Sequence, residues 1–547
     1  MKKDLFSRIV PGVLVLFASF LFADAALAQA GVDDVAENIT NSAALLPGLV
    51  TAFFYLLGLW LGYQAILRTI DHVSNPSQTP LRVPVVRFLA GGALFAAPIV
   101  FEAMHETIDG GLFGGVNPAT LFNSMSALFG AFAGGVLGSN VNGILSNIAA
   151  ETELLPGLVT AVAYLLGLLM GGIGIMKIKD HVEDPARTTM KEGVINLLVG
   201  GGMFALPAVF EAMYNTIGGG GLGVWEFLAG AISSTSFIFS SESLSPECLG
   251  ALFGIGATVG DIICNAWLTS SAVPAFLSGL SYFLGLCFGV WALVKIKNHV
   301  INPQQTSLWD GVSRLLAGGA FFALPTIIAA LQLTFAPVTA IPLQATRFIS
   351  NTTFRDDATL VCGGAGGLDD ALACFMDDIL GPGHVTLNFF SFVAGMIFIM
   401  IGVSRIVKTA QEGARGPGGR GTIATFVVGG ILLSATTILR AFSASFFGNN
   451  ITFTFANLAY TAGMTPLETQ AVYHVIGAVL KFMILIGMIS FVRGLFIMRD
   501  VAEGNQQASL MAAMTHIIGG ALAVNLGPLL NAVQTTLGVT AFGVTFV

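Results

Sequence analysis

The stretch LLPGLVTAFFYLLGLWLGYQAILRTIDHVSNPSQTPLRVPVVRFLAGGALFAAPIVFEAM, from Leu45 to Met104, decides the fold of this chain. It holds two apolar runs, 49–67 and 85–104. Each is close to the ~20 residues that a helix rising about 1.5 Å per residue needs to cross ~30 Å of hydrocarbon. Between them, Asn75-Pro76 starts a turn, and the proline cannot continue the first helix. The stretch therefore predicts a membrane hairpin of two helices.

The composition assigns most of the chain to the membrane. Of 547 residues, 54% are hydrophobic and only 10% are charged, and the mean hydropathy is +0.82. Soluble domains carry about a quarter charged residues, so most of this chain faces lipid or other helices. The net charge of −8 belongs to the loops. No clustered basic face indicates a direct nucleic-acid site.

The N-terminus has the pattern of a secretory signal peptide over residues 1–28. Lys2 and Lys3 precede an apolar run, and Ala26-Leu27-Ala28 ends it. This places small residues at the two positions that a signal peptidase inspects. We expect cleavage after Ala28; the alternative is an uncleaved first membrane helix.

The first hairpin is repeated along the chain. A shift of 109 residues lays it on a second copy without a gap, and a further shift of 118 reaches a third. Two weaker copies follow, which keep the paired glycines at 429–430 and 519–520. We predict an all-α polytopic membrane protein with five tandem two-helix hairpins, about ten crossings and Gly-rich periplasmic linkers. The predicted hairpins are 31–111, 138–218, 260–335, 386–447 and 476–547, and the linkers are 112–137, 219–259, 336–385 and 448–475.

Positive charge sets the predicted orientation. Short cytoplasmic loops retain Lys and Arg, and most of the 23 Lys and Arg residues lie at the five turns. We expect a multi-pass protein of a bacterial inner membrane, with cytoplasmic turns and both ends of the mature chain periplasmic. Apolar linker stretches such as 121–137 either lie on the membrane surface or enter it. The predicted turn residues of the first three hairpins are Arg68, His72, Lys177, Lys179, His181, Lys295, Lys297 and His299.

Glycines and prolines recur at fixed places in these hairpins. In lipid, small residues one helical turn apart let helix backbones approach closely, either within a hairpin or, as the alternative, between subunits of a ring. A proline in the second helix removes a backbone hydrogen bond and predicts a kink, with a gate as the alternative. The predicted packing residues are Gly58, Gly62, Gly167, Gly171, Gly285 and Gly289, and the predicted kinks are at Pro98, Pro207 and Pro325.

The histidines His72, His181 and His299 stand where the first helices end. Metal binding or pH sensing would use such residues. A cation at a helix C-terminus is stabilised by the helix dipole, and this suffices to explain them.

Four cysteines fall in two outer linkers, as Cys248 with Cys264 and Cys362 with Cys374. Two local disulfides are expected in an oxidising compartment; the alternative is four reduced, packed cysteines. No histidine neighbours either pair, which argues against zinc. No Walker lysine loop, zincin helix or serine nucleophile elbow is found. We therefore predict no enzyme, no cofactor and no metal.

The turn and its flanks carry a family resemblance. His72-Val-Ser-Asn-Pro-Ser-Gln-Thr-Pro80, followed by Phe88-Leu-Ala-Gly-Gly-Ala-Leu-Phe-Ala-Ala-Pro98, resembles the small two-crossing inner-membrane proteins of Dot/Icm type IVB secretion systems, of the IcmD/DotP kind. Thr515-His-Ile-Ile-Gly-Gly-Ala-Leu-Ala-Val-Asn-Leu-Gly-Pro528 is similar to the related IcmC/DotE type. Those relatives carry one hairpin each and have counterparts in conjugative transfer systems.

The resemblance implies a non-enzymatic structural subunit of a type IV secretion or conjugal transfer apparatus in the inner membrane. Its partners would be the lipid bilayer and other subunits of the apparatus, with homo-oligomerisation as a further option. Two alternatives stay open: a pilin-like hairpin polyprotein that is cut and polymerised, and an independent membrane channel or transporter.

Overall fold

The computed structural model describes residues 46–107, 155–206, 258–270, 273–335, 367–412, 419–448, 454–505, 507–539 and 543–546, with a few single positions between them. The predicted signal peptide, Pro207 and Cys248 lie outside the described residues. The chain divides into two compact units. The first contains residues up to 138, 143–229 and 279–323, and the second contains 139–142, 230–278 and 324–547.

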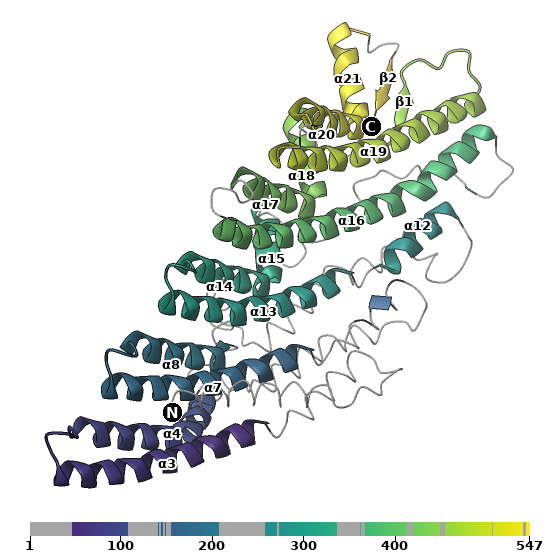
Figure 1. Ribbon diagram of the computed structural model, residues 1–547. Coiled ribbons are helices and arrows are strands. Elements are labelled where there is room, and N and C mark those ends of the chain that lie inside the picture. The colour runs from purple at the N-terminus through teal and green to yellow at the C-terminus, as the bar shows by residue number, and fades with distance from the viewer. Residues whose placement is uncertain are drawn as a thin grey trace. The chain divides into compact units, whose positions relative to one another are not determined.

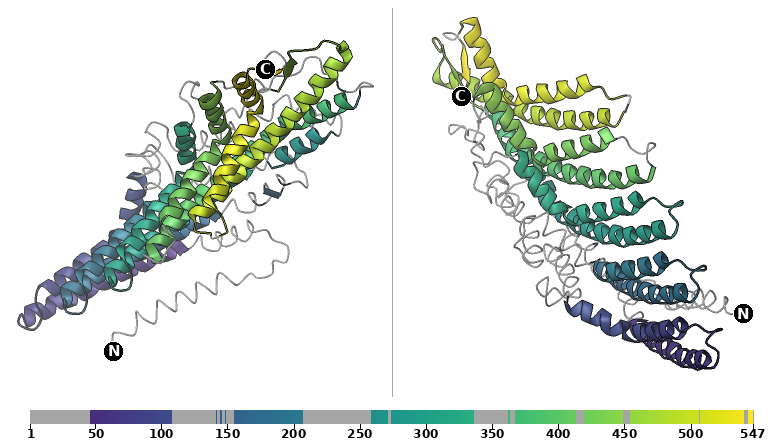
Figure 2. Two further views of the ribbon diagram at one scale, coloured as in Figure 1. Left: turned by 90° about the horizontal axis from the view of Figure 1, so that it is seen from above. Right: turned by 90° about the vertical axis from the view of Figure 1, so that its left-hand side faces the viewer.

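The first unit consists of antiparallel helix pairs whose turns lie on the same side (Figures 1 and 2). Each pair has a long first helix, a short polar turn and a second helix. Pair 1 is α3 (Leu46–Ser74) with α4 (Arg82–Thr107), pair 2 is α7 (Leu155–Glu183) with α8 (Met190–Phe204), and pair 3 is α13 (Val273–Ile301) with α14 (Leu308–Phe322).

The second unit contains two further pairs and several shorter elements (Figure 1). Pair 4 is α16 (Leu368–Glu412) with α17 (Gly419–Leu433), and pair 5 is α19 (Pro466–Ala502) with α20 (Leu510–Val524). Both first helices begin inside stretches that the sequence predicts as linkers. The other elements are α12 (Val259–Leu268), α15 (Leu324–Phe335), α18 (Ala435–Phe447), α21 (Leu526–Leu537), β1 (Ala456–Leu458) and β2 (Val544–Phe546).

The two strands form an antiparallel sheet that the all-α prediction missed. Ala456 lies opposite Phe546, and both are buried. Asn531 of α21 holds β2 by donating to the Phe546 carbonyl at 2.7 Å and accepting from its N–H at 2.9 Å. Only three residues long on each side, the strands are too short to show a clear period-two pattern in the sequence.

The two helices of every pair cross at a pair of glycines. A Cβ added at Gly58 would lie 2.7 Å from the carbonyl oxygen of Gly91, and one added at Gly91 would lie 2.8 Å from that of Gly58. A real side chain cannot occupy that space, so the backbones approach closely only because both residues are glycine. The same contact recurs at Gly167–Gly200, Gly285–Gly318, Gly395–Gly429 and Gly487–Gly520.

The second glycine of each predicted motif lies beside the same crossing. A Cβ added at Gly200 would lie 2.8 Å from the Gly171 nitrogen, and the matching distances are 3.1 Å from Gly91 to Gly62 and 3.2 Å from Gly318 to Gly289. The first glycine of each motif makes the close contact with the partner helix. The sequence missed Gly395 and Gly487, because no glycine follows either of them four residues later.

The second helices of pairs 2 to 5 end soon after the crossing. The helices α8, α14, α17 and α20 each have 15 residues, about 22 Å at 1.5 Å per residue. The pairs α17–α18 and α20–α21 bend by 81°, at Ser434 and Asn525. Asn525 donates its side-chain amide to the Ala521 carbonyl at 2.8 Å and so satisfies one acceptor at the break.

A proline is not required for such a break. Pair 4 bends although no proline stands near Ser434, and α4 runs through Pro98 to Thr107 without a break. Pro325 occupies the first turn of α15, where a proline needs no backbone donor, directly after α14 ends at Phe322. At the predicted kink of Pro98, α4 is one continuous helix. At the predicted kink of Pro325, one helix ends, and the next begins one residue before the proline.

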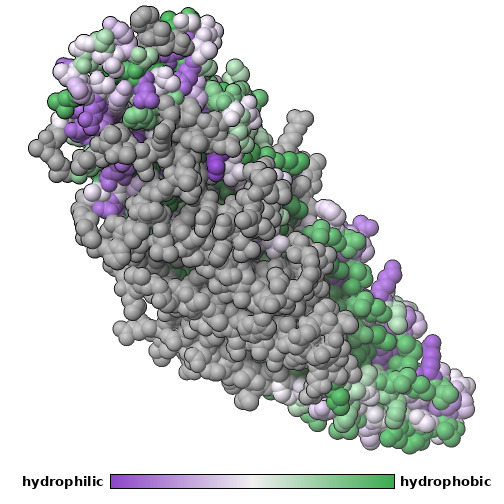
Figure 3. Space-filling model, turned by 180° about the vertical axis from the view of Figure 1, so that it is seen from behind, coloured by the Kyte–Doolittle hydropathy of each residue, from purple (hydrophilic) through white to green (hydrophobic). Residues whose placement is uncertain are grey.

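Among the described residues, six helices are long and apolar enough to cross a membrane, or up to eight if each bent pair counts as one span. The predicted class, a mostly helical multi-pass membrane protein, is consistent with this finding. The number is below the ten crossings expected, because 15-residue helices are too short for ~30 Å of hydrocarbon on their own. Many large apolar side chains are exposed on these helices, and apolar surface predominates at the lower right of Figure 3.

A disulfide joins Cys362 to Cys374, whose Cα atoms are 5.7 Å apart, at the start of α16. It closes a loop of 12 residues, worth about 3 kcal/mol in the chain-entropy view. Cys264 is also disulfide-bonded; its predicted partner, Cys248, lies outside the described residues. Cys287, in α13, is free and half-buried.

The crossing glycines can be tested against their immediate neighbours. We expect Gly200→Ala to lower the free energy of unfolding by about 1–3 kcal/mol, because the added methyl group would force α7 and α8 apart. Reversible unfolding in mixed micelles measures this change. Gly201→Ala is the matched control, because a Cβ there would meet nothing within 4 Å. Equal losses for the two variants would show that the crossing does not depend on glycine.

Candidate functional site

The turns of the first three pairs are closed by a histidine. The Nδ1 atom of His72 lies 2.7 Å from the carbonyl oxygen of Thr79, seven residues on. The same 2.7 Å contact joins His181 to Thr188 and His299 to Thr306. Since a carbonyl only accepts, Nδ1 must carry the proton. These histidines therefore hold the turn in shape, a more specific role than the helix-dipole contact that the sequence suggested.

Most predicted basic turn residues have acidic neighbours in their own pair. Lys177 pairs with Glu192, Lys179 lies 2.8 Å from Asp180 and Lys295 lies 3.5 Å from Asp310. Arg68 lies 3.5 Å from Asp71 on the same helix, in an exposed pair. Lys297 differs, because its Nζ atom lies 4.0 Å from the Met170 sulfur of the preceding pair.

Successive pairs are joined by a ridge that packs into a groove. The ridge is a row on the second helix at positions −1, +3 and +6 from its crossing glycine; in pair 1 it is Ala90, Leu94 and Ala97. The groove lies at +1, +5 and +8 from the first-helix glycine and +4 from the second-helix glycine. In pair 2 these positions are Leu168, Gly172, Ile175 and Phe204.

The first joint links pair 1 to pair 2. The pair 1 ridge is at most 7% exposed, and Leu168, Ile175 and Phe204 pack against the cluster that contains it. Phe54 of α3 lies against the remaining groove position, Gly172, where a Cβ would collide with the ring. Large residues of one pair thus enter space that the next pair leaves open.

The second joint repeats these positions. Val199 and Met203 are the ridge of pair 2, and both are buried. Val290 and Leu293, at the +5 and +8 groove positions of pair 3, pack against them.

The second unit shows the same rule. The pair 4 ridge, Val428, Leu432 and Ala435, shares a buried cluster with the pair 5 groove residues Met488, Leu495 and Val524. In the same unit, Leu324 packs with Met396 and Leu433. Leu324 stands at a ridge position, six residues after Gly318, and Met396 and Leu433 stand at two groove positions of pair 4.

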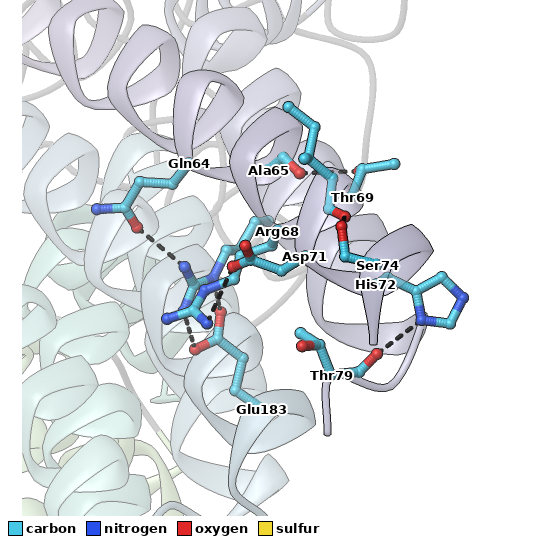
Figure 4. A network of polar contacts seen from close by, with 11 residues as sticks. Gln64, Ala65, Arg68, Thr69, Asp71, His72, Ser74, Thr79 and Glu183 are labelled. Carbon is cyan, nitrogen blue, oxygen red and sulfur yellow. Dashed lines mark hydrogen bonds and ion pairs between the residues drawn. The ribbon is translucent and has the colours of Figure 1, made fainter. Parts of the chain in front are cut away.

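An ion pair accompanies the joint near the turns. The Glu183 carboxylate accepts two hydrogen bonds from the Arg87 guanidinium of pair 1, at 2.5 and 2.9 Å. The side chains of Glu183 and Arg87 are 20% and 13% exposed. Arg87 also donates a hydrogen bond to Gln64 at 3.2 Å, and Gln64 and Glu183 are labelled in Figure 4. In the second unit, Glu503 lies 2.9 Å from Arg405 of pair 4. Both glutamates stand 16 residues beyond the crossing glycine of their first helix. Arg499 joins the second cluster at 2.5 Å from Glu503.

Charged side chains also link α16 to α19 at the end far from the turns. His474 lies 2.6 Å from Asp370, and Lys481 pairs with Asp377. The two aspartates are seven residues apart on α16, and His474 and Lys481 are seven apart on α19, so each set lies on one face of its helix. His474 and Lys481 are 3% and 5% exposed, whereas the side chains of Asp370 and Asp377 are 35% and 46% exposed. These half-exposed contacts bring the first turns of α16 against one face of α19.

Among the residues that the structure describes, one group of side chains could hold a metal ion. The ligand atoms of Asp369, Asp370 and His474 lie within 4.8 Å of one another. The sequence predicted no metal site, because the two helices are about a hundred residues apart. Both aspartates are in the first turn of α16, where the helix dipole favours carboxylates without a cation.

Sequence reasoning missed the acidic partners of the joints. The sequence assigned no role to Glu183 or Glu503, although they stand at the same position of the repeat, where pair 1 has Ser74. It also missed Asp310, which pairs with the buried Arg314, itself 4.5 Å above the Trp291 ring. The seven-residue spacing of aspartates in α16 and of His474 and Lys481 in α19 was the available signal for the far-end contacts.

No family model, curated protein or solved structure matches the chain. Its class therefore rests on the fold and on the repeated joint. The part of the chain that the structure describes is mostly helical and contains six to eight helices long and apolar enough to span a membrane. Its glycine-crossed helix pairs are joined through one repeated set of positions.

The ion pair at the first joint can be tested against an exposed pair nearby. We expect Glu183→Gln to lower the free energy of unfolding by about 1–3 kcal/mol, because it leaves a half-buried guanidinium without its charged acceptor. Asp71→Asn, in the exposed pair with Arg68, should cost less than about 0.5 kcal/mol. A double-mutant cycle with Arg87→Gln completes the measurement. Additive losses for the two partners would contradict a direct interaction.

Proposed function

We propose that the chain is a non-enzymatic structural subunit of a type IV secretion or conjugal transfer apparatus of the IVB kind, in a bacterial inner membrane. The repeated joint is the single observation that carries this. Three joints, two in the first unit and one in the second, use the same ridge and groove positions. A chain built this way adds one helix pair after another, as a scaffold requires, and its buried charges are used in packing.

The residues behind the family resemblance are those that build the turn. His72 and Thr79 close it by hydrogen bond, and the Asn75 N–H donates to the Asp71 carbonyl at 2.8 Å. The resemblance to IcmD/DotP-like proteins thus concerns a defined structural element. This supports a relationship to single-hairpin subunits of such systems.

We further propose that each helix pair is a membrane hairpin with its turn in the cytoplasm, after a signal peptide cleaved behind Ala28. Basic residues near the turns support this orientation. The helix α16, with 45 residues, is about 68 Å long and extends well beyond ~30 Å of hydrocarbon. Asp370 and Asp377 would then lie at or beyond the periplasmic surface. The bent helices α18 and α21 would lie near that surface, each after a short second helix.

A genetic experiment tests the role. We expect deletion of the gene to abolish substrate transfer in a strain that depends on the apparatus, because a missing scaffold subunit prevents assembly. The wild-type chain and the Gly201→Ala variant should restore transfer, and Gly200→Ala should restore less. Transfer quantified by a reporter fused to a substrate is the measurement. Undiminished transfer in the deletion strain would refute the proposed role.

One observation favours the pilin-like alternative. The joint would also hold separated hairpins together, since the residues described in it belong to the helices of neighbouring pairs. An immunoblot with a C-terminal tag separates the two functions: a scaffold gives one band near the 56.9 kDa of the full chain, and a processed polyprotein gives a ladder of single hairpins.

A further inference from the structure

The groove of pair 1 is open. Its four positions, Leu59, Tyr63, Ile66 and Phe95, are 61%, 55%, 56% and 44% exposed. The matching positions of pair 5 that are buried, Met488, Leu495 and Val524, are 5%, 2% and 5% exposed. Among the described residues, nothing fills the pair 1 groove, which measures about 540 Å³ and adjoins a second hollow of about 430 Å³.

The floor of this groove is backbone. Gly62 and Gly92 line it, and a Cβ added at either would meet nothing within 4 Å. In pairs 2, 3 and 5 the same positions receive a ridge from another helix pair. The occupant that fits the pair 1 groove is therefore the second helix of another helix pair.

The ridge of pair 5 is open at its α20 positions. Gly519 is exposed and Ala523 is partly exposed, whereas the third ridge position, Leu526 at the start of α21, packs against the cluster of Ala456, Leu480 and Phe546. A Cβ at Gly519 would meet nothing within 4 Å, and the neighbouring Ile518 is 41% exposed. Among the described residues, the first pair thus has an unfilled groove, and the last pair has a ridge whose two α20 positions, Gly519 and Ala523, are at least partly exposed.

The two open surfaces match in size. The pair 5 ridge has Gly519 and Ala523 where pair 4 has Val428 and Leu432. The pair 1 groove has Tyr63 at the position where pair 2 has Gly172. Small ridge side chains suit a groove that contains a large side chain, because the side chains of the two surfaces together must fill the space between the helices.

From these observations, we propose that the groove of pair 1 binds the α20 ridge of a second copy of this chain. The contact is heterologous: one surface of the first copy meets a different surface of the second, which generates rings or open arrays. It rests on the proposed membrane insertion of the helix pairs, and it does not require the secretion role.

Cysteine cross-linking of the full chain in native membranes tests this. One copy carries Ile66→Cys and a differently tagged copy carries Leu522→Cys, both with Cys287→Ala. Positions 66 and 522 correspond to Leu293 and Gly202 of the second joint, where a Cβ at Gly202 would lie 3.4 Å from the Leu293 side chain. We expect a disulfide between the two tags. Gly202→Cys with Leu293→Cys, in one chain, is the positive control for insertion and joint geometry.

If the control disulfide fails to form, the proposed membrane insertion of the pairs is wrong. If only the link between positions 66 and 522 fails to form, the contact with a second copy is wrong. A link only between two copies of position 66 would overturn it too, as would a position 66 cysteine that reacts freely with maleimide. Deletion phenotypes test the secretion role separately.

A second variant tests the groove without cysteines. Gly62→Phe should fill it and convert the assembly to single chains, as measured by native mass spectrometry of nanodisc-embedded protein. Gly48→Phe, on the same helix and with nothing within 4 Å of its Cβ, should leave the assembly intact. Assembly that survives Gly62→Phe, or wild-type protein that is already a single chain, would contradict the proposal.

Discussion

The close approach of two glycine backbones is the contact on which the rest of the structure depends. In lipid no hydrophobic force drives helices together, so their association relies on dispersion contacts, on weak Cα–H to carbonyl interactions and on small side chains that allow both. The reciprocal contact of Gly58 with Gly91, 2.7 and 2.8 Å to the opposite carbonyls, fixes the crossing point of the pair. Every other position is then defined relative to it.

That fixed crossing gives the joints their common register. Because the ridge and the groove lie at constant offsets from the crossing glycines, each pair presents the same two surfaces to its neighbours. The sizes of the ridge and groove side chains differ from joint to joint, but their positions relative to the crossing glycines are the same. Phe54 enters the space at Gly172 in one joint, and Val492 occupies the matching groove position in another. Glu183 and Glu503 add charge pairing at the same place near the turn.

The sequence predicted the helix pairs well because their signals are local. Apolar runs, an Asn-Pro turn and repeated glycines each act within a few residues, and Gly58, Gly167 and Gly285 lie at the crossings that the structure shows. The predicted His72, His181 and His299 do stand at helix ends, but their partners are threonine carbonyls across the turn, which a helix-dipole argument does not reveal.

What the sequence did not predict depends on contacts between distant segments. The Asp370–His474 and Asp377–Lys481 pairs join helices 104 residues apart, and no pattern within one helix identifies the partner. The break at Ser434 was missed because proline was taken as the signal for bending and none stands near it. The lengths of α16 and α19 were underestimated, since polar residues in their first turns resemble a linker.

The central claim is that the side chains of one pair fit, by size, into the groove of the next. Exchanging the two residues that meet at the first joint tests it most directly, through the free energy of unfolding of Phe54→Gly, Gly172→Phe and the double variant. Each single variant should be destabilised by about 2–5 kcal/mol, by a cavity or by a collision, and the double variant should recover much of that loss. Additive losses in the double variant would contradict the account.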